Sequence, residues 1–385
     1  MKKKYLLDEI QPGSQFTADA YVDEQNLFVP AGTAVRARDL DGLKRWDVEC
    51  VFCDGELKAP GSVAPAGNGK TADGKPTGTL GAFVDYKLYA EYTGMVDRLK
   101  AFMDKLADGE KVEPKILDQL AQDVLKLVRE KDVVVVSAIL SSDMQGYDLA
   151  RGGVNCAILA IVVGQTMKLP PHRLSHLATG ALLHDAGMLR VPKDIVHKKE
   201  ALTTDETQKM RAHPLQSYRI AVKELQYPDD VGLIGLQHHE RWDGTGYPRR
   251  TGGPEIDLLA RIVSVVDAFE AMVSDKPYRN SMIGYAAMKN LLSDNQRRFD
   301  PDVLKAFIRS MGIYPIGSIV LLNNAAIARV VETHADAPLR PKIKLIVDEL
   351  GQHFKDDTGE MLDLIAEKTL FIARALDPRE LAPVP

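Results

Sequence analysis

A helical pattern dominates the middle of this chain, from residue 82 to about residue 311. Apolar residues recur there at spacings of three and four, as in "PKILDQLAQDVLKLVREK". That is the period of one face of an α-helix, and no fixed longer repeat accompanies it. The pattern therefore predicts a mainly α protein whose central region is all-helical.

Two stretches with different residue patterns flank the helical region. Residues 1–57 carry short apolar runs broken by turn residues and predict a small β-containing module, and residues 58–81, rich in Gly, Pro, Ala and Thr, predict a flexible linker. Residues 312–385 begin with β-branched runs between turns and predict a small β unit. The segment "EMLDLIAEKTLFIARAL" at 360–376 predicts a final helix.

Composition and charge exclude several classes of protein. The net charge of −5 is mixed along the chain and lacks the basic surface that a nucleic-acid polymer requires. The start "MKKKYLLDEIQPG" has no signal-peptide core, and the absence of about 18 consecutive apolar residues predicts no membrane span. Cys50, Cys53 and Cys156 do not form a disulfide framework and suit a reducing cytoplasm.

The C-x-x-C pair of Cys50 and Cys53 leaves two interpretations. It is either half of a zinc or redox site, or two small apolar residues of a short strand that precedes a turn. No second pair follows, which favours the strand.

Histidines and aspartates gather at four places in the helical region. The residues of a type suited to a divalent metal are His184, Asp185, His213, His238, His239 and Asp267. A single histidine on an apolar helix is more often a hydrogen-bonded core residue, but an ionisable group in an apolar run is costly unless something neutralises it. A shared metal would neutralise several at once. Imidazole and carboxylate ligands without thiolate favour Fe or Mn, with Zn, Ni and Co as alternatives, and indicate a catalytic site.

The adjacent pair His184 and Asp185 suggests a site for two ions. The aspartate is placed to bridge two ions while the histidine binds one. Two ions about 3.5 to 4 Å apart can hold a hydroxide and clamp the attacked and departing oxygens of a phosphodiester. His184 and Asp185 are therefore the expected catalytic residues of a hydrolase.

Four segments together resemble the HD-GYP family. They are "HDAG" at 184–187, "RAHP" at 211–214, "HHERWDGTGYP" at 238–248 and "VVDAFEAMVSDKPYR" at 265–279. The resemblance covers about residues 130–311. It implies an all-helical HD domain, hydrolysis of the bacterial second messenger cyclic di-GMP to pGpG or GMP, and a metal-ligand role for the six residues above.

The substrate side has four candidates: Tyr247, Lys276, Arg279 and Arg190. Lys276 and Arg279 suit a phosphate or a guanine edge, or else form a solvated helix end. Tyr247 either faces the substrate or packs under the tight turn that its neighbouring glycines permit.

Two positions depart from the family pattern. Gly152 stands where the family has a further histidine ligand, so the ion held by His184, Asp185 and Asp267 is expected to bind more weakly. Asp148, one helical turn earlier, offers a carboxylate on the same face or is a surface residue.

Met188 stands where the family has a lysine that stabilises phosphate charge, a contact whose loss commonly costs about 100- to 1,000-fold in rate. Ser217 replaces a common glycine and suggests a change in local packing.

Three functions remain open. The first is a metal-dependent cyclic di-GMP phosphodiesterase, and the second is a degenerate receptor that binds nucleotide or metal without turnover. The third is a structural or interaction protein whose helices pair with another HD-GYP or diguanylate-cyclase protein. Retention of the eleven-residue motif and all six ligands favours the first two, because an interaction module has no use for buried metal ligands, and of these two the phosphodiesterase is preferred.

Overall fold

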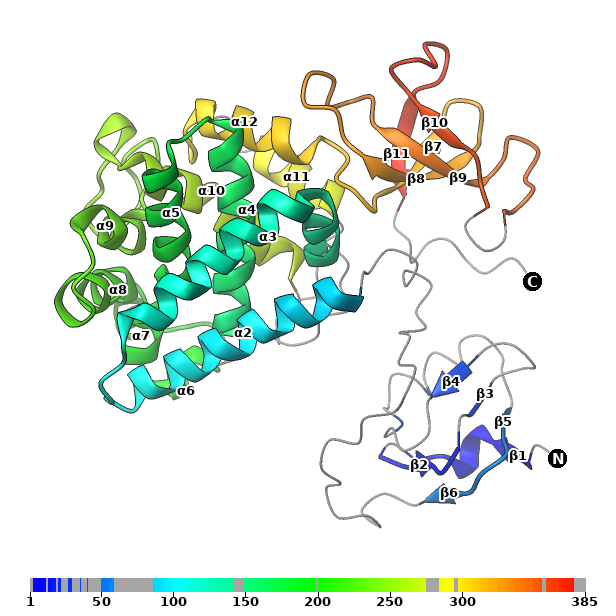
Figure 1. Cartoon of the computed structure of the whole chain (residues 1–385), viewed down its shortest axis with the longest axis horizontal. Coiled ribbons are helices and arrows are strands. Elements are labelled where there is room, and N and C mark those ends of the chain that lie inside the picture. The colour runs from blue at the N-terminus through cyan, green and yellow to red at the C-terminus, as the bar shows by residue number, and fades with distance from the viewer. Residues whose placement is uncertain are drawn as a thin grey trace. The chain divides into compact units, whose positions relative to one another are not determined.

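The protein is described from a computed structural model (Figure 1). It describes residues 3–11, 13–18, 20–21, 27–29, 35, 40, 50–58, 86–140, 148–198, 200–274, 284–293, 297–354 and 358–376. The chain divides into two compact units, Met1–Gly81 and Ala82–Pro385. From residue 59 onward, the predicted linker lies outside the described residues.

The first unit is a small β module, as predicted. Its strands are β1 (Lys3–Leu6), β2 (Gln15–Phe16), β3 (Ala20–Tyr21), β4 (Leu27–Val29), β5 (Cys50–Cys53) and β6 (Leu57–Lys58), with the 3-10 turn η1 at Leu7–Glu9. One sheet has the order β1-β5-β3-β4, and β2 pairs with β6. Cys53 is buried on β5 beside Phe16 and Val51, and its thiol donates to the Ala18 carbonyl at 3.2 Å. The strand interpretation of the cysteine pair is therefore favoured.

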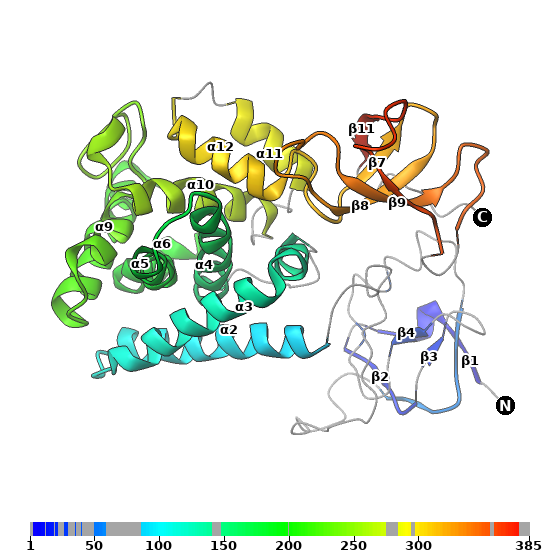
Figure 2. The same cartoon turned by 45° about the horizontal axis from the view of Figure 1, so that its top comes forward.

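The second unit begins with the predicted helical region. Its helices are α2 (Tyr86–Ala107), α3 (Pro114–Leu140), α4 (Leu149–Thr166), α5 (Pro171–Leu183), α6 (Lys193–Val196), α7 (Thr204–Met210), α8 (His213–Arg219), α9 (Asp229–Gln237), α10 (Leu258–Val273), α11 (Gly284–Ser293) and α12 (Pro301–Met311). Short turns of helix lie between them: η2 (Ala186–Arg190), η3 (Ile220–Glu224) and η4 (Gly253–Glu255). Helices α2, α3, α5, α10 and α12 pack around α4 (Figures 1 and 2). The mainly α fold is thus confirmed.

Helix α4 is the apolar centre of this bundle. By length and composition alone it could cross a membrane. Within the bundle, however, 67% of its 18-residue window is buried. Core helices of this kind are hydrophobic all round because neighbouring helices cover every face.

Aspartates begin three of the helices that surround the metal-ligand candidates. The carboxylates of Asp148, Asp257 and Asp300 accept backbone N–H groups in the first turns of α4, α10 and α12. Such caps satisfy N–H groups that have no partner within the helix. The carboxylate of Asp148 is therefore used by its own helix, and it also lies 3.5 Å from Lys100 Nζ.

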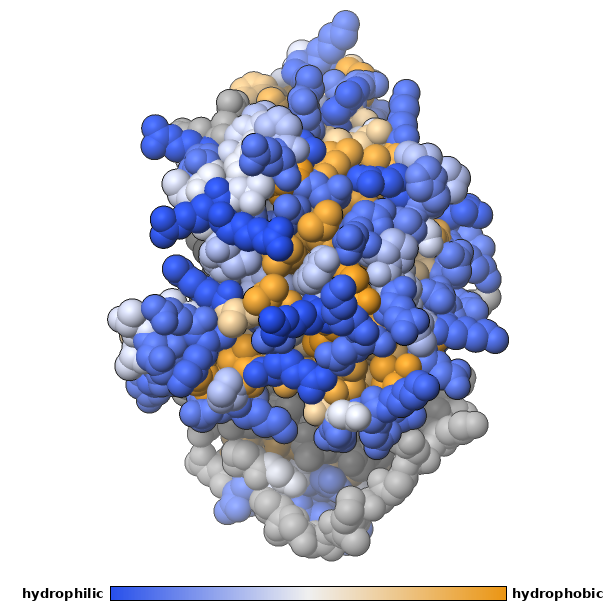
Figure 3. All heavy atoms as spheres, turned by 90° about the vertical axis from the view of Figure 1, so that its left-hand side faces the viewer, coloured by the Kyte–Doolittle hydropathy of each residue, from blue (hydrophilic) through white to orange (hydrophobic). Residues whose placement is uncertain are grey.

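The outer face over α8 and α9 is shown in Figure 3, which views the left-hand side of Figure 1. Apolar side chains gather in a band across the middle of this face, and polar side chains flank and interrupt it (Figure 3). This face is therefore a mosaic rather than an unbroken apolar surface.

The carboxy-terminal part of the second unit is an antiparallel sheet with the order β10-β9-β8-β7-β11. Its strands are β7 (Ile319–Leu322), β8 (Ile327–Glu332), β9 (Lys342–Val347), β10 (Met361–Asp363) and β11 (Ile372–Leu376). Val320, Ala328, Val330 and Ile343 are buried in its core. The predicted β unit is confirmed.

The predicted final helix at 360–376 is wrong. Two strands, β10 and β11, occupy this segment and are joined by turns. The Asp363 carboxylate accepts the Ile365 N–H at 2.9 Å and so favours a turn over a continuing helix. Leu364 is fully buried in the sheet core, and β11 pairs with β7. Pairing and burial therefore override the helical spacing of the apolar residues.

Two helix glycines give a matched test of this packing. A Cβ on Gly180 of α5 would lie 2.2 Å from Ile234 Cδ1, whereas no described atom lies within 4 Å of a Cβ on Gly94 of α2. We expect Gly94→Ala to raise the free energy of unfolding by about 0.5–1 kcal/mol, because alanine is the better helix former. We expect Gly180→Ala to lower it by about 1–3 kcal/mol through overpacking. Denaturant unfolding followed by circular dichroism measures both, and equal effects would contradict the packing.

Candidate metal centre

The end of α5 brings His184 and Asp185 into the core. The helix is buried from Leu177 to Leu183, and the chain then turns through η2 against α8. Gly187 allows this approach, because a Cβ there would lie 2.0 Å from the His213 carbonyl oxygen. The Gly187 N–H donates to Ser217 Oγ at 2.9 Å, and Ser217 is 1% exposed. Ser217 therefore fastens the turn to α8, which gives its departure from the family pattern a structural role.

Three histidines are oriented in the same way. In each ring Nδ1 lies against a backbone carbonyl three residues earlier: 2.7 Å from His184 to Ala181, 2.8 Å from His213 to Met210, and 2.8 Å from His238 to Gly235. A carbonyl only accepts hydrogen bonds, so Nδ1 carries the proton in each ring. Nε2 is therefore the nitrogen of each ring that is left to face a metal, as in metal-binding histidines.

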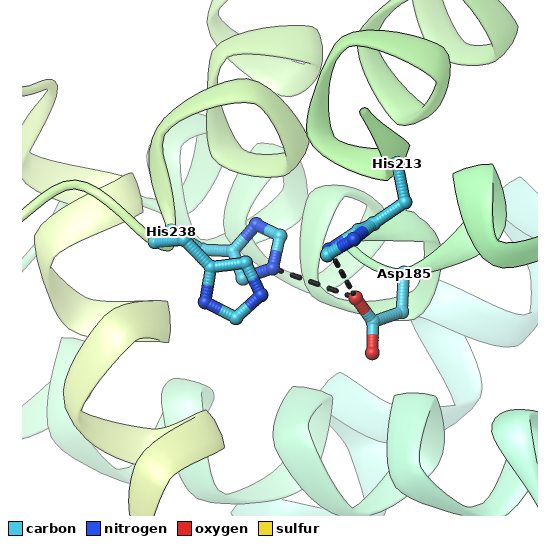
Figure 4. Close-up of side chains that lie close together, drawn as sticks. Asp185, His213 and His238 are labelled. Carbon is cyan, nitrogen blue, oxygen red and sulfur yellow. Dashed lines mark ion pairs between the residues drawn. The ribbon is translucent and has the colours of Figure 1, made fainter. Parts of the chain in front are cut away.

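Two of these Nε2 atoms point at one carboxylate oxygen. Asp185 Oδ1 lies 3.2 Å from His213 Nε2 and 3.4 Å from His238 Nε2 (Figure 4). Among the described residues, none of these three buried atoms has a hydrogen-bond partner. Lone pairs that face one another without a bridging proton leave a place for a cation. The donor set therefore fits a divalent metal ion.

His239 completes this first group. One ligand atom from each of Asp185, His213, His238 and His239 lies within 4.8 Å of the others. Burial and the neighbouring His238 hold the pKa of His239 well below its usual range, so its ring is neutral and able to coordinate. This ring also stacks on Tyr247, with 4.8 Å between the ring centroids.

A second group lies on the other side of Asp185. His184 Nε2 is 3.6 Å from Asp185 Oδ2 and 3.7 Å from Asp267 Oδ1, which comes from α10. The sulfur of Cys156 on α4 joins them, because the ligand atoms of Cys156, His184 and Asp267 lie within 4.8 Å of one another. Sequence reasoning treated Cys156 only as a sign of a reducing compartment. The available signal was its place one helical turn after Gly152.

Charge coupling dominates the second group when no metal is bound. Burial opposes a charge on His184, but the carboxylates of Asp185 and Asp267 outweigh it and raise the pKa of His184 to about 9. Burial likewise opposes ionisation of Asp267, yet the contact with His184 lowers its pKa to about 2. Asp185 has a pKa well below its usual range for the same reason. The carboxylates are therefore ionised, and a proton on His184 occupies the position of a cation.

The turn after His239 is fixed by its backbone. Gly244 has a φ of +74°, and a Cβ on Gly246 would lie 2.4 Å from the Arg241 nitrogen. Buried Glu240 accepts the Arg249 N–H at 2.6 Å and so closes the loop. Both glycines are thus required by the turn that carries Tyr247.

The substrate-side candidates have different placements. Tyr247 stacks on His239 as described, but the exposed Arg190 pairs with Glu224 at 3.2 Å. Lys276 and Arg279 lie outside the described residues. A cation that sequence reasoning missed is Arg211, whose guanidinium carbon lies 5.1 Å from the centroid of the Tyr247 ring. Its only sequence signal was its position in "RAHP".

Buried polar contacts behind the second group hold α4 against α10. Asn155 Nδ2 donates to Glu270 Oε1 at 3.0 Å, and Tyr92 donates to Asn155 Oδ1 at 2.7 Å. Ser274 Oγ donates to the same Glu270 oxygen at 2.6 Å. Glu270 is one helical turn after Asp267, so these contacts set the register of the two helices at the candidate centre.

Comparison with known proteins agrees with this geometry. Residues 134–303 match the HD domain family, and residues 319–383 match the KOW domain associated with HD domains. The chain is 30% identical over 237 residues to a cyclic di-GMP phosphodiesterase of Pseudomonas aeruginosa, covering 62% of this chain and 57% of that protein. It is 35% identical over 194 residues to cyclic di-GMP phosphodiesterase PdeB of Borreliella burgdorferi, covering 50% and 51%.

A third relative has a different named substrate. The 3′3′-cGAMP-specific phosphodiesterase 3 of Vibrio cholerae is 33% identical over 139 residues, covering 36% of this chain and 30% of that protein. The chain spans little more than half the length of the first two relatives. The chain therefore contains an HD domain followed by a match to the KOW domain associated with HD domains, and over these regions it is similar to cyclic di-GMP phosphodiesterases.

Proposed function

We propose that this protein is a metal-dependent phosphodiesterase that hydrolyses cyclic di-GMP to pGpG or GMP in bacterial second-messenger signalling. The observation that carries the proposal is the pair of buried Nε2 atoms that face Asp185 Oδ1 without a hydrogen bond. The names of the two relatives that cover half or more of the chain support the substrate.

Two divalent ions, with Fe or Mn favoured, are proposed for the two groups of ligands. His213, His238 and His239 would hold one ion, His184 and Asp267 the other, and Asp185 would lie between them. Such a pair lowers the pKa of water and neutralises charge on the phosphodiester. His184 and Asp185 are the proposed catalytic residues because they lie where the two groups meet.

The substrate would approach from the side of Tyr247. The Tyr247 ring lies between His239 and the Arg211 guanidinium, so it can offer an aromatic edge while Arg211 supplies positive charge. Met188 stands where the family has a lysine, and Arg211 is proposed to supply the positive charge that this lysine would provide. Lys276 and Arg279 remain proposals for phosphate or guanine contacts, and Arg190 would first have to leave Glu224.

A nucleotide or metal receptor without turnover is the second candidate. Gly152 and Met188 support it, because they remove one ligand and one phosphate contact from the family pattern. A cytoplasmic location and a homodimer or signalling-protein partner belong to either candidate as proposals. The enzyme is favoured over the receptor because each of the two groups still offers at least three ligand atoms to an ion.

Removing one imidazole tests the centre. We expect His238→Ala to lose metal and to reduce hydrolysis of cyclic di-GMP by at least about 100-fold, because a ligand that faces Asp185 is lost. Elemental analysis and nucleotide chromatography measure the two effects. His172→Ala, an exposed histidine on α5, is the matched control and should change neither. Full metal content and turnover in His238→Ala would refute the proposed ligand set.

The pKa of His184 gives a pH dependence. Metal binding must displace the proton on His184, whose pKa the carboxylates of Asp185 and Asp267 raise from 6.5 to about 9, so metal affinity should rise with pH across that window. In the metal-free protein the sign is opposite: stability from the protonated ring is full below pH 6.5 and is lost as pH rises through about 9.

Metal titrations and unfolding of the metal-free protein at several pH values measure both trends. His184→Gln should flatten the stability trend between pH 6.5 and about 9 relative to wild type. An unchanged slope in this variant would show that another group titrates.

Restoring the two missing family residues should raise turnover. No described atom lies within 4 Å of a Cβ on Gly152, so a side chain has room to start there. We expect Gly152→His with Met188→Lys to increase the rate of cyclic di-GMP hydrolysis by about tenfold or more, through one added ligand and one added phosphate contact. Steady-state kinetics measure it, with Gly94→Ala as a remote control. No gain would mean that the present site works by another arrangement.

A further inference from the structure

We propose that Cys156 supplies a thiolate ligand to the ion held by His184 and Asp267, in place of the imidazole that Gly152 lacks. This inference rests on the proposed function for the presence of an ion between these groups. It makes the two ions chemically different, one bound by nitrogen and oxygen and the other by sulfur as well.

The geometry suits one shared ion. The ligand atoms of Cys156, His184 and Asp267 lie within 4.8 Å of one another. Metal–ligand bonds of about 2.0 to 2.3 Å allow donors on opposite sides of an ion to be about 4.4 Å apart. A shift of less than about one ångström therefore brings all three atoms into coordination range.

The surroundings favour a built site over a chance neighbour. Cys156 is 1% exposed and His184 is 3% exposed. Beside them, buried His213 Nε2 and Asp185 Oδ1 have no hydrogen-bond partner among the described residues. Since Asp185 belongs to both groups, the second group is continuous with polar atoms that already require a cation.

The register of α4 explains why the cysteine can replace the missing histidine. Cys156 is one helical turn after Gly152 and shares its face. The side chain of its neighbour Asn155 donates a hydrogen bond to Glu270, which lies one helical turn after Asp267. This hydrogen bond holds α4 and α10 opposite each other at the level of Cys156. The thiol therefore lies at the level of the proposed ion.

A thiolate ligand changes which metals the second group prefers. On binding, the thiol loses its proton to solvent and the sulfur forms the metal bond, with no change of oxidation state. Thiolate favours softer ions such as Zn²⁺ and Fe²⁺ over Mn²⁺ and Mg²⁺. The sequence-based argument for a site without thiolate is therefore revised for this ion alone.

Cobalt(II) gives a direct readout of a thiolate ligand. A thiolate bound to Co²⁺ produces charge-transfer absorption in the near ultraviolet, whereas imidazole and carboxylate ligands do not. We expect the full-length metal-free protein to gain this absorption on titration with Co²⁺ and to bind about two equivalents. Cys156→Ser should lose the absorption and about one equivalent of metal. The double variant Cys50→Ala/Cys53→Ala, which removes the other two cysteines, should retain both.

A rescue variant separates ligation from folding. Gly152→His with Cys156→Ala should bind two equivalents again without the charge-transfer absorption, since imidazole replaces the thiolate. Its helical circular dichroism should match that of wild type. The proposal would be overturned if cobalt-loaded wild-type protein lacked the charge-transfer absorption, or if Cys156→Ser retained it in full. The first of these results requires no variant.

Hydrolysis is scored separately on the same samples. Absorption without turnover of cyclic di-GMP would refute the proposed function and leave the cysteine ligand in place. Turnover without absorption would refute the ligand and leave the function in place.

Discussion

Buried lone pairs that face one another are the constraint on which the centre of this protein depends. Asp185 Oδ1 is opposed by the Nε2 atoms of His213 and His238, and no hydrogen bond relieves the contact. Burial of such groups is unfavourable unless a positive charge lies between them. The carbonyls that hold each Nδ1 and the turn fastened by Ser217 keep these atoms pointed at one place. The helical bundle thus maintains an arrangement that only a cation completes.

Much of this was predictable from the sequence because the signals were local. The helical period located the bundle, and turn residues located the two β regions. The six metal-type side chains were found by type and by their apolar surroundings, and the structure brings them together in two groups. The roles of these six residues remain proposals, as do those of Lys276 and Arg279, which lie outside the described residues.

The failures came from tertiary context. Residues 360–376 have the spacing of a helix, but pairing of β11 with β7 and burial of Leu364 make the segment part of a sheet. The position of Cys156 beside the candidate metal centre was not predicted, because its neighbours there, His184 and Asp267, are distant in sequence. Neither of these outcomes can be read from a short window of residues.

The ligands also have a mechanical meaning. The proposed ligands come from α4, the end of α5, the start of α8, the end of α9 and the middle of α10, so one pair of ions would join five separate segments. Such cross-links close long loops and reduce the conformational entropy of the unfolded chain. The proposed metal centre would then also cross-link the domain, and loss of the ions would loosen the helices that carry the candidate ligands.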